Sequence, residues 1–519
     1  MVATYRVRIR IALSLVALVM ASLVVGMVAP RPVAEALEVG AQASSDRYYE
    51  VTPNSFADAI DKILGSQNGS AGTLTISFEP GTYTVKHQLR VYSNTVIKFN
   101  GATLRNESDA AMMRFGDNVG ASADTRKYNG VHDVTLENGV FDGNYDTDAL
   151  MHFSHASNVS IKNMKFKNVK AAHHVEFAAC KNVSVTNCAF SGYHTLGSSR
   201  NDEALQMDVL YKGHFSDGAF DCTPCTNVTI TGCTFTNVQR GVGTHSNLTG
   251  SFHSNITISN NTFRNIPGYA IIATNYSNSR IQNNVISNCS AGILYRTVGL
   301  TFYRGASAAA LKNANTVISG NSVEVTNKKY STTSYGIQVY GENIKKKTKN
   351  GVIGDYRARG VSVSGNTVNL KDNGYGVWVQ GCVGVSVANN VINSLVPANG
   401  DGKGNGDGIR LVQSSSVKIT GNRINHGKKN AKNKNACGIV LDKSKATIVG
   451  NTVKKSLKYG IFANNKSKMT CKKNKVKKYK VYGIVSGPKS VVKAKAKKFK
   501  NKVSGSKKKA YHSTGGKMK

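Results

Sequence analysis

The amino-acid sequence predicts an all-β protein, a right-handed, single-stranded parallel β-helix (a solenoid) with a short N-terminal capping helix. Three observations lead to this fold class. A short phrase of β-branched residues followed by Asn or Gly recurs in about a dozen coils, equivalent positions lie about 23 to 25 residues apart, and helical periodicity is missing. Because each coil of a solenoid packs only against its neighbours, the 519 residues need not be divided into several globular domains.

The recurring phrase predicts a strand, a tight turn and a second strand. Two examples are Val159-Ser-Ile-Lys-Asn163-Met-Lys-Phe166 and Val361-Ser-Val-Ser-Gly365-Asn-Thr-Val368. Alternation places Val, Ile and Phe on one face, and Asn or Gly supplies the left-handed backbone at the corner, where stacked asparagines can form an amide ladder. A second phrase, as in Tyr375-Gly-Val-Trp-Val379, indicates the remaining strand of each coil.

The N-terminal segment has the features of a signal peptide, predicted over residues 1–43. Arginines precede an apolar run from Ile11 to Val28, and small-residue cleavage sites follow it. The run is nearly long enough to span a bilayer, so an uncleaved anchor is the alternative. Either interpretation predicts an exported protein.

The β-helix is expected over residues 46–503, followed by a basic tail over 504–519. The segment Ser55–Ile60 predicts an amphipathic helix that covers the exposed first coil, ahead of the strand-like segment from Phe78 to Tyr83. In this helix and the following Pro-Gly-Thr-Tyr, the chain resembles the pectate-lyase-like superfamily of secreted β-helices. The resemblance spans nearly all of the mature chain and implies a fold rather than a reaction.

The nine cysteines do not suggest a fully paired disulfide framework, because their number is odd. We expect most of them to be small buried side chains. For Cys222-Thr-Pro-Cys225 a disulfide within a loop is favoured over a redox pair or half of a metal site, since no second such motif completes a zinc site.

The net charge of +39 is concentrated at the C-terminal end, where about thirty lysines after residue 425 face a single acid, Asp442. Such lysine-rich coils are expected to attract anionic cell-wall polymers, anionic lipids or acidic glycans, and so to retain the secreted protein at the cell wall. The alternative is a soluble terminal cap. Nucleic acid is disfavoured as a partner because the protein is expected outside the cell and lacks interleaved aromatic stacking positions.

A candidate site emerges when the coils are aligned on inward apolar residues, because equivalent positions of adjacent coils lie about 4.8 Å apart. Acids, histidines and an arginine then converge on one stripe between residues 146 and 275. Isolated acids or histidines on such a face are usually solvated or surface ion pairs, but clustering favours a function. The aligned anchors are Met151, Val175, Leu205, Val242 and Ile271.

This stripe predicts acid/base chemistry on a glycosidic bond, in which one carboxyl protonates the leaving oxygen and another activates water or attacks. The predicted catalytic carboxylates are Asp202, Glu203 and Asp208. The predicted substrate contacts are His152, His173, Glu176, Gln206, Arg240 and His245.

Asp202-Glu203-Ala204-Leu205 resembles the coil position at which polygalacturonase-type glycoside hydrolases carry paired aspartates before an apolar residue. That resemblance implies inverting hydrolysis. However, His173 stands where the family has another aspartate, and Arg240 stands where it has a histidine, with Glu176 and Asp208 as candidate replacements. The prediction is therefore a related but distinct glycosidase.

Two other function classes remain open. A polysaccharide lyase would use Arg240 as base and would need calcium or another neutraliser of a uronate, but no lysine lies in the stripe. A non-catalytic adhesin or wall-associated protein would not need localised acids. The hydrolase is expected to act as a monomer on a polysaccharide or oligosaccharide, and no cofactor is predicted for it, with calcium as the alternative.

Overall fold

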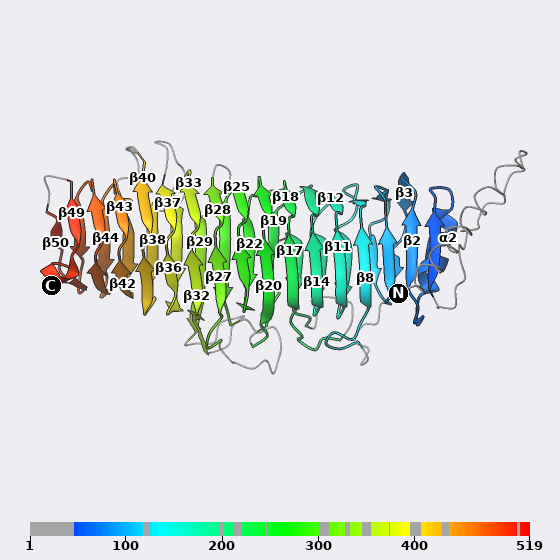
Figure 1. Ribbon diagram of the computed structural model, residues 1–519, viewed down its shortest axis with the longest axis horizontal. Helices are drawn as coiled ribbons and strands as arrows, with labels where there is room; N and C mark the ends of the chain where they lie inside the picture. The colour runs from blue at the N-terminus through cyan, green and yellow to red at the C-terminus, as the bar shows by residue number, and fades with distance from the viewer. Residues whose placement is uncertain are drawn as a thin grey trace, which may run out of the picture.

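The chain folds into a long rod of stacked coils, with the N-terminal coils at one end and the C-terminal coils at the other (Figure 1). Strands of one coil pair in parallel with the equivalent strands of the next. The predicted parallel β-helix is thereby confirmed. The computed structural model describes residues 46–117, 125–196, 202–211, 219–244, 246–248, 250–299, 311–326, 333–344, 354–372, 374–394, 406–427, 435–505 and 509–519.

Each coil contributes strands to three sheets, named here A, B and C. In the described residues sheet A has 18 strands, sheet B has 15 and sheet C has 16. The strands of sheet A are β1 (Arg47–Val51), β2 (Leu74–Phe78), β5 (Thr95–Lys98), β8 (His132–Glu137), β11 (Ser157–Lys162), β14 (Lys181–Thr186), β17 (Thr226–Thr231), β20 (His253–Ser259), β23 (Tyr276–Ser277), β24 (Arg280–Gln282), β27 (Thr316–Ser319), β32 (Val361–Ser364), β36 (Ser386–Ala388), β39 (Val417–Thr420), β42 (Lys445–Val449), β45 (Lys468–Lys472), β48 (Val491–Lys493) and β51 (Lys517–Met518).

Sheet B follows sheet A in each coil, after a tight corner. Its strands are β3 (Thr82–Val85), β6 (Thr103–Asn106), β9 (Val140–Asp142), β12 (Lys165–Val169), β15 (Ala189–Tyr193), β18 (Thr234–Thr236), β21 (Thr262–Arg264), β25 (Val285–Cys289), β28 (Ser322–Val325), β33 (Thr367–Leu370), β37 (Val391–Ser394), β40 (Arg423–His426), β43 (Thr452–Lys454), β46 (Lys475–Lys477) and β49 (Lys502–Ser504).

Sheet C closes each coil and carries the predicted site. Its parallel strands are β4 (Leu89–Val91), β7 (Met113–Phe115), β10 (Ala149–Ser154), β13 (His173–Ala178), β16 (Glu203–Asp208), β19 (Arg240–Gly243), β22 (Tyr269–Thr274), β26 (Ala291–Thr297), β29 (Ser334–Ile344), β34 (Gly374–Gln380), β38 (Asp407–Val412), β41 (Ile439–Asp442), β44 (Tyr459–Asn464), β47 (Tyr482–Ser486) and β50 (Tyr511–Ser513). The remaining elements are β30 (Gly354–Tyr356), antiparallel to β29, the β31–β35 pair (Ala358–Arg359 and Cys382–Val383), helix α2 (Phe56–Gly65) and the 3₁₀ turn η1 (Lys497–Phe499).

The core is a continuous column of apolar side chains inside the coils. On sheet B the rings of Phe166, Phe190, Phe235 and Phe263 stack with centroids 4.6 to 5.2 Å apart, and each is at most 1% exposed. Because one coil alone cannot bury these rings, the stacking of coils is what stabilises the fold.

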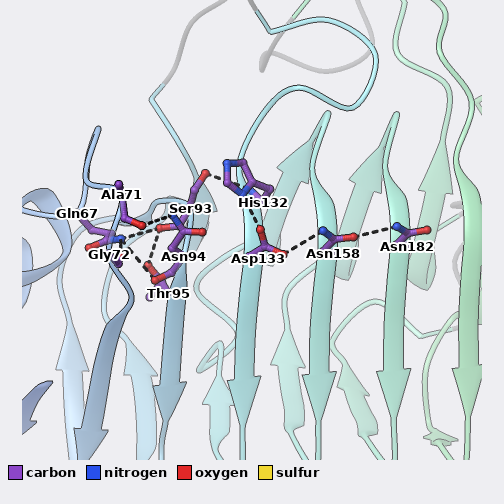
Figure 2. A network of polar contacts seen from close by, with 10 residues as sticks. All are labelled: Gln67, Ala71, Gly72, Ser93, Asn94, Thr95, His132, Asp133, Asn158 and Asn182. Carbon is purple, nitrogen blue, oxygen red and sulfur yellow. Dashed lines mark hydrogen bonds and ion pairs between the residues drawn. The ribbon is translucent and has the colours of Figure 1, made fainter. Parts of the chain in front are cut away.

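Asparagine ladders fix the corners, as the sequence predicts. On the surface, Asn158 donates to Asp133 at 3.0 Å and Asn182 donates to Asn158 at 2.8 Å (Figure 2). All three have positive φ, which asparagine and aspartate tolerate better than most residues. A second, buried ladder links Asn261, Asn284, Asn321, Asn366, Asn390, Asn422, Asn451, Asn474 and Asn501 through side-chain bonds of 2.9 to 3.1 Å.

The first coil is capped as predicted, by a helix that is longer than the sequence pattern suggested. Helix α2 buries Phe56, Ile60, Ile63 and Leu64 against the first coils. Just beyond it, the Gln67 amide donates to the carbonyl oxygens of Gly72 and Ser93 at 2.6 and 3.0 Å (Figure 2).

At the other end, the coils extend further than the predicted boundary at residue 503. The predicted basic tail contains β50 and β51, which pair with β47 and β48. Tyr511 and Met518 of these strands still pack on the core. The alternation of apolar and polar residues is hard to recognise there because lysines are frequent among the neighbouring residues. The predicted signal peptide lies outside the described residues, and among those described no helix is long and apolar enough to cross a membrane.

The cysteines are free thiols, and eight of the nine are buried. The expected Cys222–Cys225 loop disulfide is therefore not formed. Cys225 is instead drawn into the coil, where its Sγ accepts a hydrogen bond from the backbone N–H of Cys180 at 3.4 Å. Burial raises the pKa of the Cys225 thiol to about 12, which makes it unreactive near neutral pH.

Candidate active site

The register of sheet C confirms the coil alignment made from the sequence. Met151 pairs with Val175, Val175 with Leu205, Leu205 with Val242, and Val242 with Ile271. All five are at most 1% exposed and face the core. The residue after each anchor alternates to the other face, so β10, β13, β16 and β19 bring their polar residues together on the outside of sheet C.

The centre of the cluster is the amide of Gln206, which connects two carboxyl groups. Its nitrogen donates to Glu176 Oε1 at 3.0 Å and also to Asp208 Oδ2. Because one nitrogen donates to both carboxyl groups, these two oxygens lie at most about 6 Å apart. Asp208 Oδ1 accepts a further bond from the backbone N–H of Ser246 at 3.2 Å.

Glu203, on the same strand as Gln206 and Asp208, forms a separate ion pair with Arg240 of the next strand. Arg240 Nη1 lies 3.3 Å from Glu203 Oε1, and the two residues are directly opposite each other on β16 and β19. The Glu203 side chain is fully buried, whereas Arg240 is 20% exposed. Gly243 makes room for this carboxylate, since a Cβ there would lie 2.8 Å from Glu203 Cγ.

Asp202 lies apart from the other two predicted catalytic carboxylates. It precedes β16, accepts a hydrogen bond from the Ala172 backbone N–H at 3.0 Å, and accepts another from the Tyr193 hydroxyl. His173 Nδ1 donates to the Glu203 carbonyl oxygen at 2.6 Å. The sequence grouped Asp202 with Glu203 and Asp208, but the structure ties it to the corner between sheets B and C.

His152 lies at the solvent-facing edge of the cluster. Its Nε2 is 3.5 Å from Glu176 Oε2, and its side chain is 17% exposed. These contacts form one connected polar path across three strands, in the order His152, Glu176, Gln206 and Asp208. The remaining predicted contact, His245, lies outside the described residues.

The cluster is much less exposed than its outward position suggests. Glu203, Gln206 and Asp208 are all 0% exposed, and Glu176 is 6% exposed. The Asp208 charge acts on His253, whose pKa burial lowers to about 4 against the opposing pull of that carboxylate. Burial also raises the pKa of Tyr276, and the nearby charges of Asp208 and Glu203 reinforce this shift.

Several residues that surround the predicted carboxylates were not found from the sequence. Tyr193 comes from sheet B and Ser246 from the segment after β19, and neither follows the aligned rows. Arg296 does follow one of those rows, because it pairs with Thr274 in the next coil. Burial lowers the Arg296 pKa while the Glu203 carboxylate opposes that shift, so extending the alignment by one coil would have found it.

The arrangement offers carboxyl groups, amides and a guanidinium for acid/base work or for holding a polar ligand. In the described ranges, no group of three or more His, Cys, Asp or Glu side chains has the arrangement of a metal site.

Comparison with known proteins places the fold in a family. The family model described as "Right handed beta helix region" matches residues 214–373 and 350–519, which is more than half of the chain. The chain belongs to the right-handed β-helix family. This family membership supports the pectate-lyase-like resemblance at the level of the fold.

One curated relative of this β-helix is the plasmin and fibronectin-binding protein A of Streptococcus pneumoniae, 25% identical over 295 residues. The match covers 50% of this chain and only 39% of the relative's length.

Two solved structures were also found to be similar to this chain. The surface protein and adhesin PfbA of Streptococcus pneumoniae is 18% identical with a TM-score of 0.49, covering 85% of this chain and 96% of the other. The exopolygalacturonase of Thermotoga maritima is 12% identical with a TM-score of 0.44, covering 66% and 87%.

Proposed function

We propose that this protein is an exported carbohydrate-active enzyme that hydrolyses a glycosidic bond of a polysaccharide or oligosaccharide on the outer face of sheet C. The observation that carries the proposal is the Gln206 amide bridging Glu176 and Asp208, which holds two carboxyl oxygens within about 6 Å. Carboxyl pairs lie about 5 to 5.5 Å apart in retaining glycosidases and about 6.5 to 9.5 Å apart in inverting ones, so this limit suits a retaining reaction.

In this proposal Glu176 touches the substrate, because it is the less deeply buried member of the pair, 6% exposed against 0% for Asp208. Two carboxyl groups in a site with little water favour sharing one proton over two full charges, and that proton would pass to the leaving oxygen. Asp208 would then serve as the nucleophile that attacks the sugar as the leaving group departs, and water would release the sugar from it in a second step. Arg240, already paired with Glu203, has the exposure needed to bind an anionic group of the substrate.

A second candidate is a surface adhesin without catalysis, and one observation favours it. Glu203 and Asp208 are fully covered, so their ion pairs and hydrogen bonds could serve only to hold three coils together. The curated relative, named for binding plasmin and fibronectin, is compatible with that role.

The proposed hydrolysis is tested by incubating the mature protein with plant, host and bacterial glycans. We expect new reducing ends without the ultraviolet absorbance of unsaturated products, because hydrolysis adds water across the bond. Unsaturated products would instead identify a lyase. The absence of any product across the panel, together with binding to plasmin or fibronectin, would favour the adhesin.

We also propose that the C-terminal coils retain the protein at the cell wall through anionic polymers. Lysines occupy sheets A and B there, whereas the described strands β41, β44, β47 and β50 of sheet C contain none. A groove of about 530 Å³ on sheet A is lined by Lys418, Lys445, Lys468 and Lys493, with Thr447 and Thr470 between them. Rows of like charge on one face suit an extended polyanion.

Replacing Lys445, Lys468 and Lys493 by glutamine should weaken binding to purified wall teichoic acid about tenfold at low salt, because three charges leave one groove. The difference should shrink at high salt, where exposed charges are screened. The matched control removes three exposed lysines from N-terminal coils, Lys86, Lys98 and Lys165. Equal loss of binding in both variants would mean that net charge alone is responsible.

A further inference from the structure

Beyond the carboxylate cluster, the outer face of sheet C carries a group of aromatic side chains. Tyr335 on β29 is directly opposite Tyr375 on β34, and Gln338 is opposite Trp378. The Trp378 ring centroid lies 4.4 Å from Tyr375 and 5.6 Å from Tyr335, and the two tyrosine rings stack 5.8 Å apart. All three rings are partly exposed at outward positions.

Their exposure is not needed for folding. The inward residues of the same strands, Ile337, Val377 and Val379, are 0% exposed and already form the core. Aromatic rings left in contact with water contribute little stability, but Trp and Tyr at surfaces are the side chains that most often anchor a bound partner. The group therefore has the properties of a binding surface.

Polar side chains lie among the rings. The Trp378 indole N–H donates to Gln380 Oε1 at 3.0 Å. The Arg410 guanidinium lies 5.7 Å from the Trp378 ring centroid and 5.8 Å from that of Tyr375, and it is held by Asp407 at 2.8 Å. Partly exposed aromatic rings beside amides and a guanidinium suit a sugar, which presents C–H groups on one face and hydroxyls around its edge.

The aromatic group is continuous with the carboxylate cluster. Tyr269, in the same outward row as Glu203 and Arg240, donates its hydroxyl to Gln338 Oε1 at 2.5 Å. Five strand steps separate β16 from β34, or about 24 Å at about 4.8 Å a step. A linear saccharide of several units, lying along the rod, would reach from one to the other.

We propose that Tyr335, Tyr375 and Trp378 form a distal subsite that binds sugar units of a linear glycan chain extending along sheet C from the carboxylate cluster. The proposal rests on the proposed function for its substrate class, and it assigns the recognition of chain length to this subsite. A saccharide is favoured over a protein because the rings lie on adjacent strands along the rod, and the Arg410 charge is already met by Asp407 at 2.8 Å and Asp442 at 3.9 Å.

Trp378 is the only tryptophan of the chain, so its fluorescence reports on this subsite alone. The probes are disaccharides and hexasaccharides of galacturonic acid, glucose and N-acetylglucosamine, added to the mature protein. We expect one hexasaccharide series to change the Trp378 emission. Tyr335→Ala, which keeps the fluorophore, should weaken that binding about tenfold. Tyr48→Ala, on β1 of sheet A, is the matched control and should leave binding unchanged.

The outcomes separate this proposal from the proposed hydrolysis. An emission change without new reducing ends would support the subsite and refute the hydrolase. Reducing ends from a hexasaccharide that leaves the Trp378 emission unchanged would overturn the subsite while the hydrolase stands. An emission change caused by fibronectin or plasmin, and by none of the saccharides, would also overturn it, because the occupant would then be a protein.

Discussion

Glu176→Gln is expected to lower kcat at least a hundredfold on whichever glycan the protein cleaves, with a much smaller change in the thermal midpoint. The glutamine keeps an oxygen that accepts the Gln206 bond, but it cannot hold or release the proton that the leaving oxygen requires. The measurement is steady-state release of reducing ends across a range of pH, where the variant should lose one limb of the pH profile.

Asp208→Asn should reduce kcat by a similar factor but should also lower the midpoint. Both Asp208 oxygens accept hydrogen bonds, one from Gln206 and one from Ser246, and an asparagine can accept with only one of them. Glu137→Gln is the matched control, because Glu137 is a carboxylate of sheet A paired with Lys162 at 2.8 Å. If the Glu176 and Glu137 variants retained equal activity, the cluster would not be the catalytic site.

Most of the fold was predictable because a β-helix repeats one physical rule. Alternating apolar residues and left-handed asparagines fix each coil, so the pairing of Val175 with Leu205 and of Leu205 with Val242 follows from matching phrases. The same logic brought Glu176, Gln206 and Asp208 together on the outer face. The C-terminal strands β50 and β51 were missed because dense lysines hide their alternation.

The burial of the site could not be predicted in the same way. An outward position in a strand normally meets water, yet Asp208 is 0% exposed and bonded to Ser246. That contact depends on the path of segments between strands, which follow no repeat. The position of Asp202 apart from the other carboxylates could not be predicted for the same reason, since it depends on a hydrogen bond from Tyr193 across the corner between sheets B and C.

The aromatic subsite shows a different limit of sequence reasoning. Tyr375-Gly-Val-Trp-Val379 was recognised as a strand, and that assignment is correct for β34. The phrase does not reveal that Tyr335 and Trp378 meet on one face, which depends on the pairing of β29 with β34.

Acidification from about pH 6.5 to about pH 4 should destabilise the fold strongly through three buried histidines. His174, His253 and His426 are at most 1% exposed, and burial lowers the pKa of each to about 4 from the ordinary value of 6.5. The unfolded chain therefore binds more protons than the folded chain between these values, so stability falls as pH falls. Each histidine contributes about 3 kcal/mol over this window, on the order of 10 kcal/mol together.

Two buried aspartates also change the stability of the fold as pH falls, one in the same direction as the histidines and one in the opposite direction. Asp142 is held below its ordinary pKa by Asn168 and Lys167 although burial opposes them, so its contribution is lost at still lower pH. Burial raises the Asp407 pKa, which partly offsets the histidines. The check is the thermal midpoint across this pH range for the protein and for His253→Gln, with His87→Gln, an exposed histidine paired with Asp61, as control. We expect a shallower dependence on pH only in His253→Gln. Equal slopes in all three proteins would show that buried histidines do not set the acid sensitivity.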